Sequence, residues 1–405
     1  MSGFKLLSLA WLLPVVFLLG GCLEESRELS IPPRTEPQDQ ANVGLGPGVR
    51  PLSSGPGEKG SPAWSPSGGR IAFIVDDYVV DKPLDERDFR RRTTKDFNAE
   101  TVTWLSSGAP AGDSLAILGT NSRSGSGGSS SAPLNLYETP ATEGTLEVTR
   151  IETGARTMAS APNSREVFLA LSDAGSGSQL ATLDHEGEVR RYDARIEGDI
   201  TGLSVSADGN QAVLAVRNGA PSGRSELYTF SLPRGVLEPL VELEDGIEIL
   251  GNPQWTENGI YYVAGEEQEA AAAAPYDLYR IPPGASVPEP VSGIGNDFVT
   301  SNLERDPQGG RLAVIGRRNP GSPQNLYVLD LVTKDLESVT SNENMEIKTG
   351  AEDLAWSADG NSIAIVARSL LSEPKVYSAR SEALVTDFYN LHQVPVGALK
   401  EPGAS

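Results

Sequence analysis

The sequence predicts an all-β fold, and three observations lead to this prediction. First, a block of ten residues recurs along the chain. Second, its copies are anchored at residues 64, 104, 160, 205, 255, 305 and 356, which are 40–56 residues apart, close to the period of a β-propeller blade. Third, each copy reads as four short strands of falling hydrophobicity, which suits a blade running from a crowded axis to a wet rim. We therefore expect a single β-propeller of about seven four-stranded blades, within a range of six to eight.

The first 21 residues predict a signal peptide. Lys5 is the only charged residue among them, and the apolar run Leu6–Leu19 is shorter than the roughly 20 residues that a membrane-spanning helix needs. The run ends in Leu19-Gly20-Gly21-Cys22, and Cys22 is the only cysteine of the chain. This ending resembles the lipobox of bacterial lipoproteins. The resemblance implies cleavage between Gly21 and Cys22 and a lipid on Cys22, while an ordinary secretory signal is the alternative.

Residues 22–60 read as a lipidated cysteine followed by a flexible, disordered tether, because they lack periodic apolar residues and are dense in proline, glycine and charge. In the alternative reading, part of this linker, around Ala41–Val49, pairs as an extra edge strand. We expect the propeller over residues 61–390 and a C-terminal tail over 391–405. The lipid would attach the protein to a membrane of the cell envelope. The expected place is the periplasmic face of the outer membrane in a two-membrane bacterium, and otherwise the outer face of the cell membrane.

The recurring block has one local design, seen in the copies Trp64–Phe73 and Trp356–Ile365. An apolar strand ends near the tryptophan, and a Ser/Pro/Asp-Gly cluster then makes a tight turn in which glycine supplies a positive φ. A second strand of small and β-branched residues follows. A third strand often carries Leu-Tyr, and a fourth is more polar. We expect the tryptophans to pack between blades because they share one phase of the repeat: Trp64, Trp104, Trp255 and Trp356.

The run Trp64-Ser65-Pro66-Ser67-Gly68, followed by Ile71-Ala72-Phe73 and later by Leu-Tyr pairs such as Leu326-Tyr327, resembles the WD40-like (PD40) repeat of TolB-type propellers. The resemblance covers about residues 61–390. It implies the propeller fold and no particular activity. TolB itself carries a separate α/β domain ahead of its propeller, and residues 23–60 are too few to form such a domain.

Composition excludes several classes of function. The chain has 33 Lys+Arg against 55 Asp+Glu, a net charge of −22, whereas nucleic-acid binding needs clustered basic residues. One cysteine cannot form a multi-cysteine zinc site, and two histidines leave little for histidine-dependent catalysis. The sequence contains neither Gly-x-Ser-x-Gly nor the phosphate-binding Gly-x-x-x-x-Gly-Lys-Ser/Thr. We expect no metal, no cofactor and no nucleic-acid partner, and the oligomeric state stays open.

One face of the propeller is the expected binding face. In a four-stranded blade, the links from strand 2 to strand 3 and from strand 4 to the next blade open on the same face. The long insertions fall mostly in links of the first kind: Asn121–Ala132, Arg217–Arg224, Gly265–Pro275 and Gly316–Pro323. The blade-to-blade links carry acidic residues that would ring one mouth of the central channel: Asp199, Glu242, Glu244, Asp245, Glu248, Glu343, Glu346, Glu352 and Asp353. We expect this mouth to bind a protein or other cationic partner, the alternative being carboxylates that merely solvate the surface.

These observations favour a non-enzymatic scaffold or binding module, membrane-anchored at the cell envelope, which binds its partner on the long-loop face and has no catalytic residues. One alternative is a propeller-based envelope hydrolase or lyase that uses carboxylates at the channel mouth, because paired Asp/Glu side chains can perform acid–base chemistry when burial separates their pKa values. Another is a sensor of a small ligand. Buried carboxylates with strongly shifted pKa values in a deep pocket would favour the enzyme.

Overall fold

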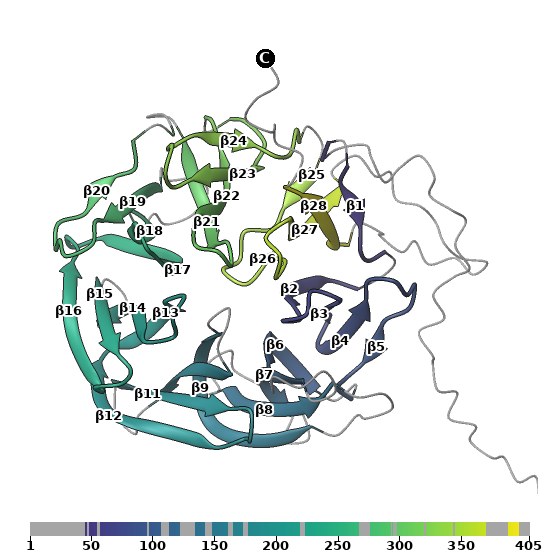
Figure 1. Ribbon diagram of the computed structural model, residues 1–405, viewed down its shortest axis with the longest axis horizontal. Helices are drawn as coiled ribbons and strands as arrows, with labels where there is room; N and C mark the ends of the chain where they lie inside the picture. Colours follow the sequence, from purple (N-terminus) through teal and green to yellow (C-terminus); the bar gives the residue numbers. More distant parts are fainter. Residues whose placement is uncertain are drawn as a thin grey trace, which may run out of the picture. The chain divides into compact units, whose positions relative to one another are not determined.

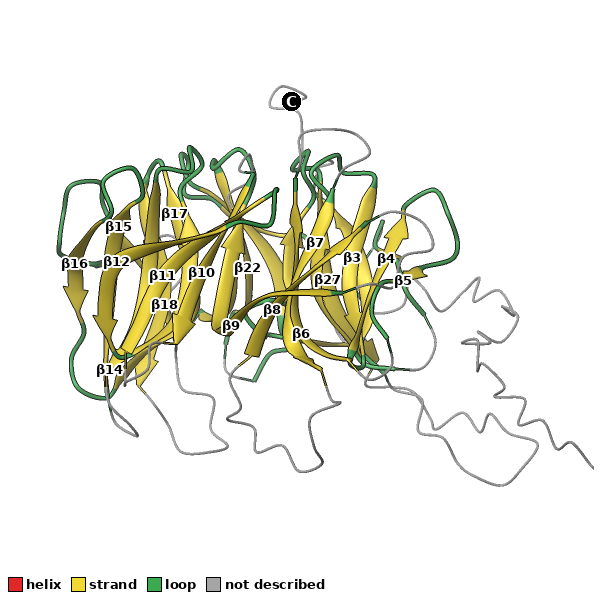
Figure 2. Cartoon of the chain, turned by 90° about the horizontal axis from the view of Figure 1, so that it is seen from below, coloured by secondary structure: helices red, strands yellow, loops and turns green. Residues whose placement is uncertain are grey.

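The protein is described here from a computed structural model. The structure describes residues 45–46, 48–54, 57–94, 97–106, 113–121, 134–141, 148–160, 165–172, 177–218, 223–266, 276–292, 294, 298–319, 321–342, 345–369 and 388–396. The predicted signal peptide, Gly21, Cys22, Glu343 and most of the long insertions lie outside these residues. Every helix or strand in the described ranges is a β-strand (Figure 2). Accordingly, no helix there has the length and apolar character needed to span a bilayer.

The strands form antiparallel sheets arranged around a central axis (Figure 1). The innermost strands of successive sheets contact one another in chain order, and the last of them contacts the first, so the ring is closed. The described residues make up seven blades, because one seven-stranded sheet contains two blades that share a strand. The predicted all-β propeller is thereby confirmed.

Four blades are separate four-stranded sheets whose strands follow chain order from the axis to the rim. Blade 1 consists of β2 (Lys59–Trp64), β3 (Arg70–Val75), β4 (Tyr78–Pro83) and β5 (Arg90–Arg91). Blade 4 consists of β13 (Asp199–Val205), β14 (Gln211–Asn218), β15 (Arg224–Ser231) and β16 (Val236–Glu242). Blade 5 consists of β17 (Ile247–Thr256), β18 (Gly259–Glu266), β19 (Asp277–Ile281) and β20 (Glu289–Pro290). Blade 6 consists of β21 (Val299–Arg305), β22 (Arg311–Arg317), β23 (Asn325–Asp330) and β24 (Leu336–Ser338).

Blades 2 and 3 share the long strand β9 (Thr149–Ser160). Its first half pairs with β8 as the outer strand of blade 2, and its second half pairs with β10 as the inner strand of blade 3. The chain thus passes from the rim of blade 2 to the axis of blade 3 within one strand. The other strands of blade 2 are β6 (Phe97–Leu105), β7 (Ser114–Asn121) and β8 (Leu134–Pro140). Those of blade 3 are β10 (Glu166–Ser172), β11 (Gly177–Asp184) and β12 (Val189–Glu197).

Blade 7 combines the two ends of the folded chain. Its strands are β25 (Met345–Ile347) and β26 (Leu354–Trp356), which share the inner position, then β27 (Ser362–Ser369), β28 (Asn390–Pro395) and β1 (Arg50–Pro51). The N-terminal strand β1 pairs with β28 through Arg50↔Gln393 and Pro51↔His392 and closes the ring. The linker therefore does supply an edge strand, just beyond the Ala41–Val49 segment that we considered.

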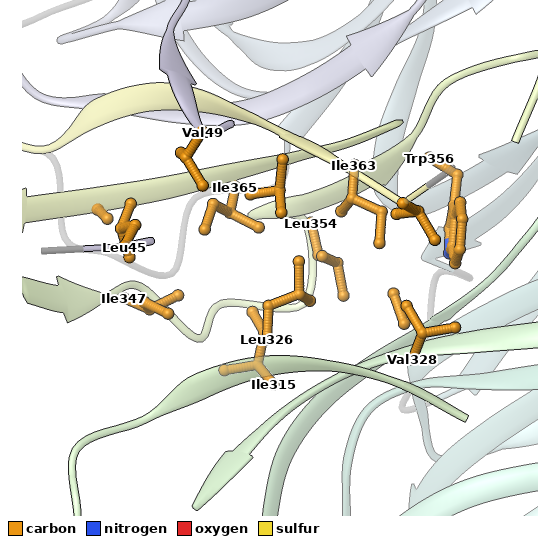
Figure 3. Packing of buried hydrophobic residues seen from close by; sticks show 14 residues of the cluster. Leu45, Val49, Ile315, Leu326, Val328, Ile347, Leu354, Trp356, Ile363 and Ile365 are labelled. Atoms are coloured by element: carbon orange, nitrogen blue, oxygen red, sulfur yellow. The ribbon is translucent and has the colours of Figure 1, made fainter. Parts of the chain in front are cut away.

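Apolar packing explains why the folded body extends past both ends of the predicted 61–390 range. Leu45 and Val49 from the predicted linker, and Val394 and Val396 from the predicted tail, are buried in one cluster with residues of blades 6 and 7 (Figure 3). Burying such side chains contributes about 1.5–3 kcal/mol each. Both boundaries therefore move outward, to about residues 45 and 396.

Three tryptophans connect neighbouring blades through their indole N–H groups, each of which donates to a backbone oxygen of the preceding blade's inner strand. The pairs are Trp64 to Ala355 at 3.1 Å, Trp104 to Ala63 at 2.9 Å and Trp356 to Glu304 at 3.0 Å. Trp255 packs against a buried cluster that contains residues of blades 4 and 5. The tryptophans thus have the expected packing role between blades.

Candidate functional site

The central channel contains a cavity of about 280 Å³ lined by the inner strands of all seven blades. It extends from the middle of these strands to the tight turns between strands 1 and 2, at Pro66, Pro307 and Ala358. Because those turns lie on the opposite face from the long insertions, the cavity reaches toward the face that we did not expect to bind a partner.

One side of this cavity is more polar than the other. Seven equivalent inner-strand positions, each paired with the third residue of strand 2, can be compared around the ring. Five of them carry small side chains: Ala63, Thr103, Ala159, Ser204 and Ala355. Blades 5 and 6 instead carry Gln254 and Glu304, so the larger polar groups gather on one wall.

At this position a polar side chain also ties its blade to the next one. The Trp255 backbone N–H donates to Ser204 Oγ at 3.2 Å, and the Arg305 backbone N–H donates to Gln254 Oε1 at 3.2 Å. The Trp356 backbone N–H donates to the Glu304 carboxylate in the same way. Part of the role of Glu304 is therefore structural. Its Oε2 atom, however, is buried and has no hydrogen-bond partner in the described part of the protein.

A second carboxylate reaches the cavity because the inner strand of blade 7 is interrupted. The strands β25 and β26 both pair with β27, and residues 349–353 between them, here called the plug segment, leave the ladder. Ala351 and Glu352 of this segment line the cavity. Asn252 Nδ2 donates to Glu352 Oε1 at 3.1 Å. Asn302 Nδ2 donates to the Gly350 backbone oxygen at 2.8 Å.

Burial changes the acidity of both carboxyl groups, here called the channel pair. It raises the pKa of Glu304 well above its usual range, and the negative charge of Glu352 raises it further. Burial also raises the pKa of Glu352. The hydrogen bond from Asn252 lowers this pKa, and the negative charge of Asp353 raises it. Both side chains keep some exposure because they border the cavity, while protein encloses their other sides. Carboxyls with shifted pKa values in a cavity are typical of acid–base sites.

The other predicted acidic residues that the structure describes do not line the cavity, and most of them form ion pairs. The pairs are Asp199 with Arg156, Glu242 and Asp245 with Arg224, Glu248 with Arg217, Glu346 with Arg368, and Asp353 with Lys348. Glu244 is exposed, and Glu343 is outside the described residues. Binding of a cationic partner by this ring stays a prediction.

Among the predicted residues that the structure describes, only Glu352 therefore lines the cavity. Sequence analysis did not single out its partner Glu304, because that residue lies inside a regular strand of the repeat. The signal that could have found it is an acidic residue at a repeat position where most copies carry Ala, Ser or Thr. The described residues include no group of three or more His, Cys, Asp or Glu side chains that could hold a metal ion.

No protein-family model matches the sequence, and no curated protein matches it. Solved structures do match its fold. An oligogalacturonate lyase in complex with manganese superimposes with a TM-score of 0.57 at 11% identity, covering 86% of this chain and 92% of the lyase. A puromycin-hydrolysing peptidase from Mycobacterium tuberculosis superimposes with a TM-score of 0.54 at 12% identity, covering 82% of this chain and 56% of the peptidase. At these identities the likeness shows the fold alone.

TolB from Acinetobacter baumannii also matches, over 86% of this chain and 79% of its own, with a TM-score of 0.41 at 11% identity. The propeller fold that the resemblance to TolB-type repeats implied is confirmed by the ring of antiparallel sheets described above. The expectation of a non-enzymatic scaffold is corrected, because the lyase and the peptidase that share this fold are enzymes. The alternative of a propeller-based hydrolase or lyase fits these matches better.

Proposed function

We propose that this protein is an acid–base enzyme, a hydrolase or lyase whose catalytic pair is Glu304 and Glu352. The observation that carries the proposal is the location of both carboxyls in one cavity where burial raises the pKa of each. Two such neighbouring groups do not both ionise readily, so the pair holds its last proton to a higher pH than an isolated glutamate does. One member can then donate a proton while the other accepts one.

The pair suits cleavage of a carbon–oxygen bond, as in an oligosaccharide. In hydrolysis, a water molecule gives a proton to one carboxylate as its oxygen bonds to carbon, and the leaving oxygen takes the proton of the other carboxyl. In elimination, the first carboxylate takes the proton from a carbon, a C=C bond forms, and the leaving oxygen is again protonated by the other carboxyl. In either reaction one carboxylate gains a proton and the other carboxyl loses one. Proton exchange with water then restores the starting protonation of the pair.

The lyase match supports an oligosaccharide substrate, because the fold covers 92% of an enzyme named for its action on oligogalacturonate. The peptidase match gives less support, since 56% of that chain is covered and this sequence contains no Gly-x-Ser-x-Gly. The manganese of the lyase structure is not carried over, because the described residues here offer no group of three suitable His, Cys, Asp or Glu ligands.

The test is an assay of the full-length protein with oligogalacturonates and with neutral oligosaccharides. Ultraviolet absorbance of a new C=C bond reports elimination, and the release of reducing ends alone reports hydrolysis. We expect E304Q and E352Q each to lower the rate by about 10²–10⁴-fold. The matched control is E346Q, since Glu346 is ion-paired to Arg368 and lies outside the cavity. Activity that persists in both channel variants would refute the assignment.

We also propose that a lipid on Cys22 anchors the enzyme to a membrane of the cell envelope. The sequence Leu19-Gly20-Gly21-Cys22 and the absence of any other cysteine support this proposal. Two or three acyl chains on one cysteine would hold the protein durably at the bilayer. Expression of C22S in a bacterial host with labelled fatty acid tests it. The variant should take up no label and should leave the membrane fraction, whereas equal labelling of both forms would refute the anchor.

A further inference from the structure

The two carboxyls of the channel pair have different hydrogen-bond environments, and Asn252 causes the difference. Asn252 lies in a bulge of β17, between the pairs Leu250↔Val263 and Gln254↔Tyr261. The bulge packs closely on the inner strand of blade 4: a Cβ on Gly202 would lie 2.5 Å from the Gly251 backbone oxygen. A residue with a Cβ at position 202 would displace this bulge, so Gly202 permits the close packing that positions Asn252.

The orientation of the Asn252 amide is set by a donor that cannot be reversed. The Leu203 backbone N–H donates to Asn252 Oδ1 at 3.2 Å. A backbone N–H can only donate, so the oxygen of the amide must face Leu203 and the Nδ2 group must face Glu352, to which it donates at 3.1 Å. A donor of this kind stabilises the ionised form of a carboxyl.

Glu304 has the opposite environment, as its counterpart in blade 5 shows. Gln254 Oε1 accepts the Arg305 N–H, while its Nε2 donates to the backbone oxygens of Asn252 at 3.2 Å and Leu303 at 3.4 Å. Glu304 likewise accepts a backbone N–H, from Trp356. The Oε2 atom of Glu304 corresponds to the Nε2 donor of Gln254, and it has no hydrogen-bond partner in the described ranges. A carboxylic acid that carries its proton there has the same donor and acceptor pattern as glutamine.

We infer that Asn252 is a positioning residue that keeps Glu352 ionised as the base of the pair and thereby leaves the proton on Glu304, the acid. This inference rests on the proposed function and assigns the roles within it. Glu352 accepts the proton that leaves water or a substrate carbon, and Glu304 gives its proton to the leaving oxygen. Among the described residues, the other charged groups acting on the pair are Arg305, beside Glu304, and Asp353, beside Glu352. Asp353 is ion-paired to Lys348, which limits its effect on Glu352.

The test is a pH titration of the glutamate side-chain carboxyls in full-length protein labelled with ¹³C at Cδ, with E304Q and E352Q used to assign the two signals. In the wild type, Glu352 should titrate at lower pH than Glu304. N252A, which removes the donor without adding charge, should raise the Glu352 midpoint by about one pH unit. The matched control is N302A, because Asn302 also holds the plug segment but bonds to Gly350 and not to Glu352. If N252A does not fold, N252S takes its place.

The outcomes separate this inference from the proposed function, because the titration needs no substrate. Glu304 titrating below Glu352, or a Glu352 midpoint that N252A leaves unmoved, would overturn the role of Asn252. If the enzyme is active, N252A should also shift the acidic limb of the kcat/KM profile upward by about one pH unit, and N302A should not. An active enzyme whose acidic limb is unchanged in N252A would overturn the inference and leave the proposed function standing.

Discussion

The guanidinium of Arg70 lies over the indole ring of Trp104, 5.1 Å from the ring centroid. Arg311 and Trp356 repeat this contact at 4.9 Å. In both cases the arginine begins strand 2 of one blade and the tryptophan belongs to the inner strand of the next. Each of these tryptophans also donates its indole N–H to the arginine's blade. One aromatic side chain therefore joins two blades by a cation–π contact and a hydrogen bond.

Replacing Trp104 by phenylalanine should weaken the junction between blades 1 and 2. The variant keeps an aromatic ring under Arg70 but leaves the Ala63 backbone oxygen without its donor. We expect a loss of about 1–2 kcal/mol in the free energy of unfolding, measured by chemical denaturation. W255F is the control, since no indole hydrogen bond is seen for Trp255 in the described part of the chain. An equal loss in both variants would show that ring size, and not the hydrogen bond, matters.

E304Q should become increasingly more stable than the wild type as the pH rises. The pKa of Glu304 is raised on folding, so the folded wild-type protein binds this proton more tightly than the unfolded chain. Its stability therefore decreases as the pH rises from the ordinary glutamate pKa through the folded pKa, whereas glutamine does not titrate. Chemical denaturation of both proteins across this range measures the difference. A constant difference would mean that Glu304 is as acidic in the folded protein as in the unfolded one.

Acidification should destabilise blade 7 through His392. Burial lowers the pKa of His392 to about 4, although an interaction with the Ala367 backbone opposes this shift. Between the ordinary pKa of about 6.5 and pH 4, the unfolded chain binds a proton that the folded protein does not, so stability falls as the pH falls. H392L does not lose this stability. The difference in the free energy of unfolding between H392L and the wild type should therefore shift in favour of H392L by about 2 kcal/mol between pH 7 and pH 5.

Denaturant titrations of both proteins at pH 7 and pH 5 measure this change. H185Q is the control, because the side chain of His185 is 33% exposed. The same pH dependence in H392L and the wild type would assign the acid sensitivity to other groups.

Leu45→Ala should destabilise the propeller although it lies in the segment predicted as linker. Leu45 is 4% exposed and packs with residues of blades 6 and 7. Truncating a buried leucine costs about 2–5 kcal/mol, which a denaturation curve resolves. V332A is the control, because Val332 is 80% exposed and should tolerate the change. A Leu45→Ala variant as stable as the wild type would show that Leu45 belongs to the linker and not to the folded core.

The architecture could be predicted because the features that define a blade are local. The turn from Ser65 to Arg70, for example, closes with the Ser65 N–H on the Arg70 oxygen, and the turns at Ser206, Asp306 and Ser357 repeat this bond. Antiparallel pairing between strands joined by short links follows from such turns, so repetition along the chain already predicts a ring of similar sheets. The phase shared by the tryptophans predicted their packing between blades for the same reason.

The site was decided by tertiary structure. Asn252 and Glu352 are 100 residues apart in the chain, and they meet because ring closure brings blades 5 and 7 to one channel while a bulge and a strand interruption turn their side chains inward. Neither irregularity has a periodic signal. The acidic residues that the sequence did reveal are mostly paired with arginines from neighbouring strands, and no single-strand pattern shows such pairing. An edge strand from the linker was among the alternatives that the sequence offered, but its position at Arg50–Pro51 could not be predicted, since two residues become a strand only when β28 offers them an edge.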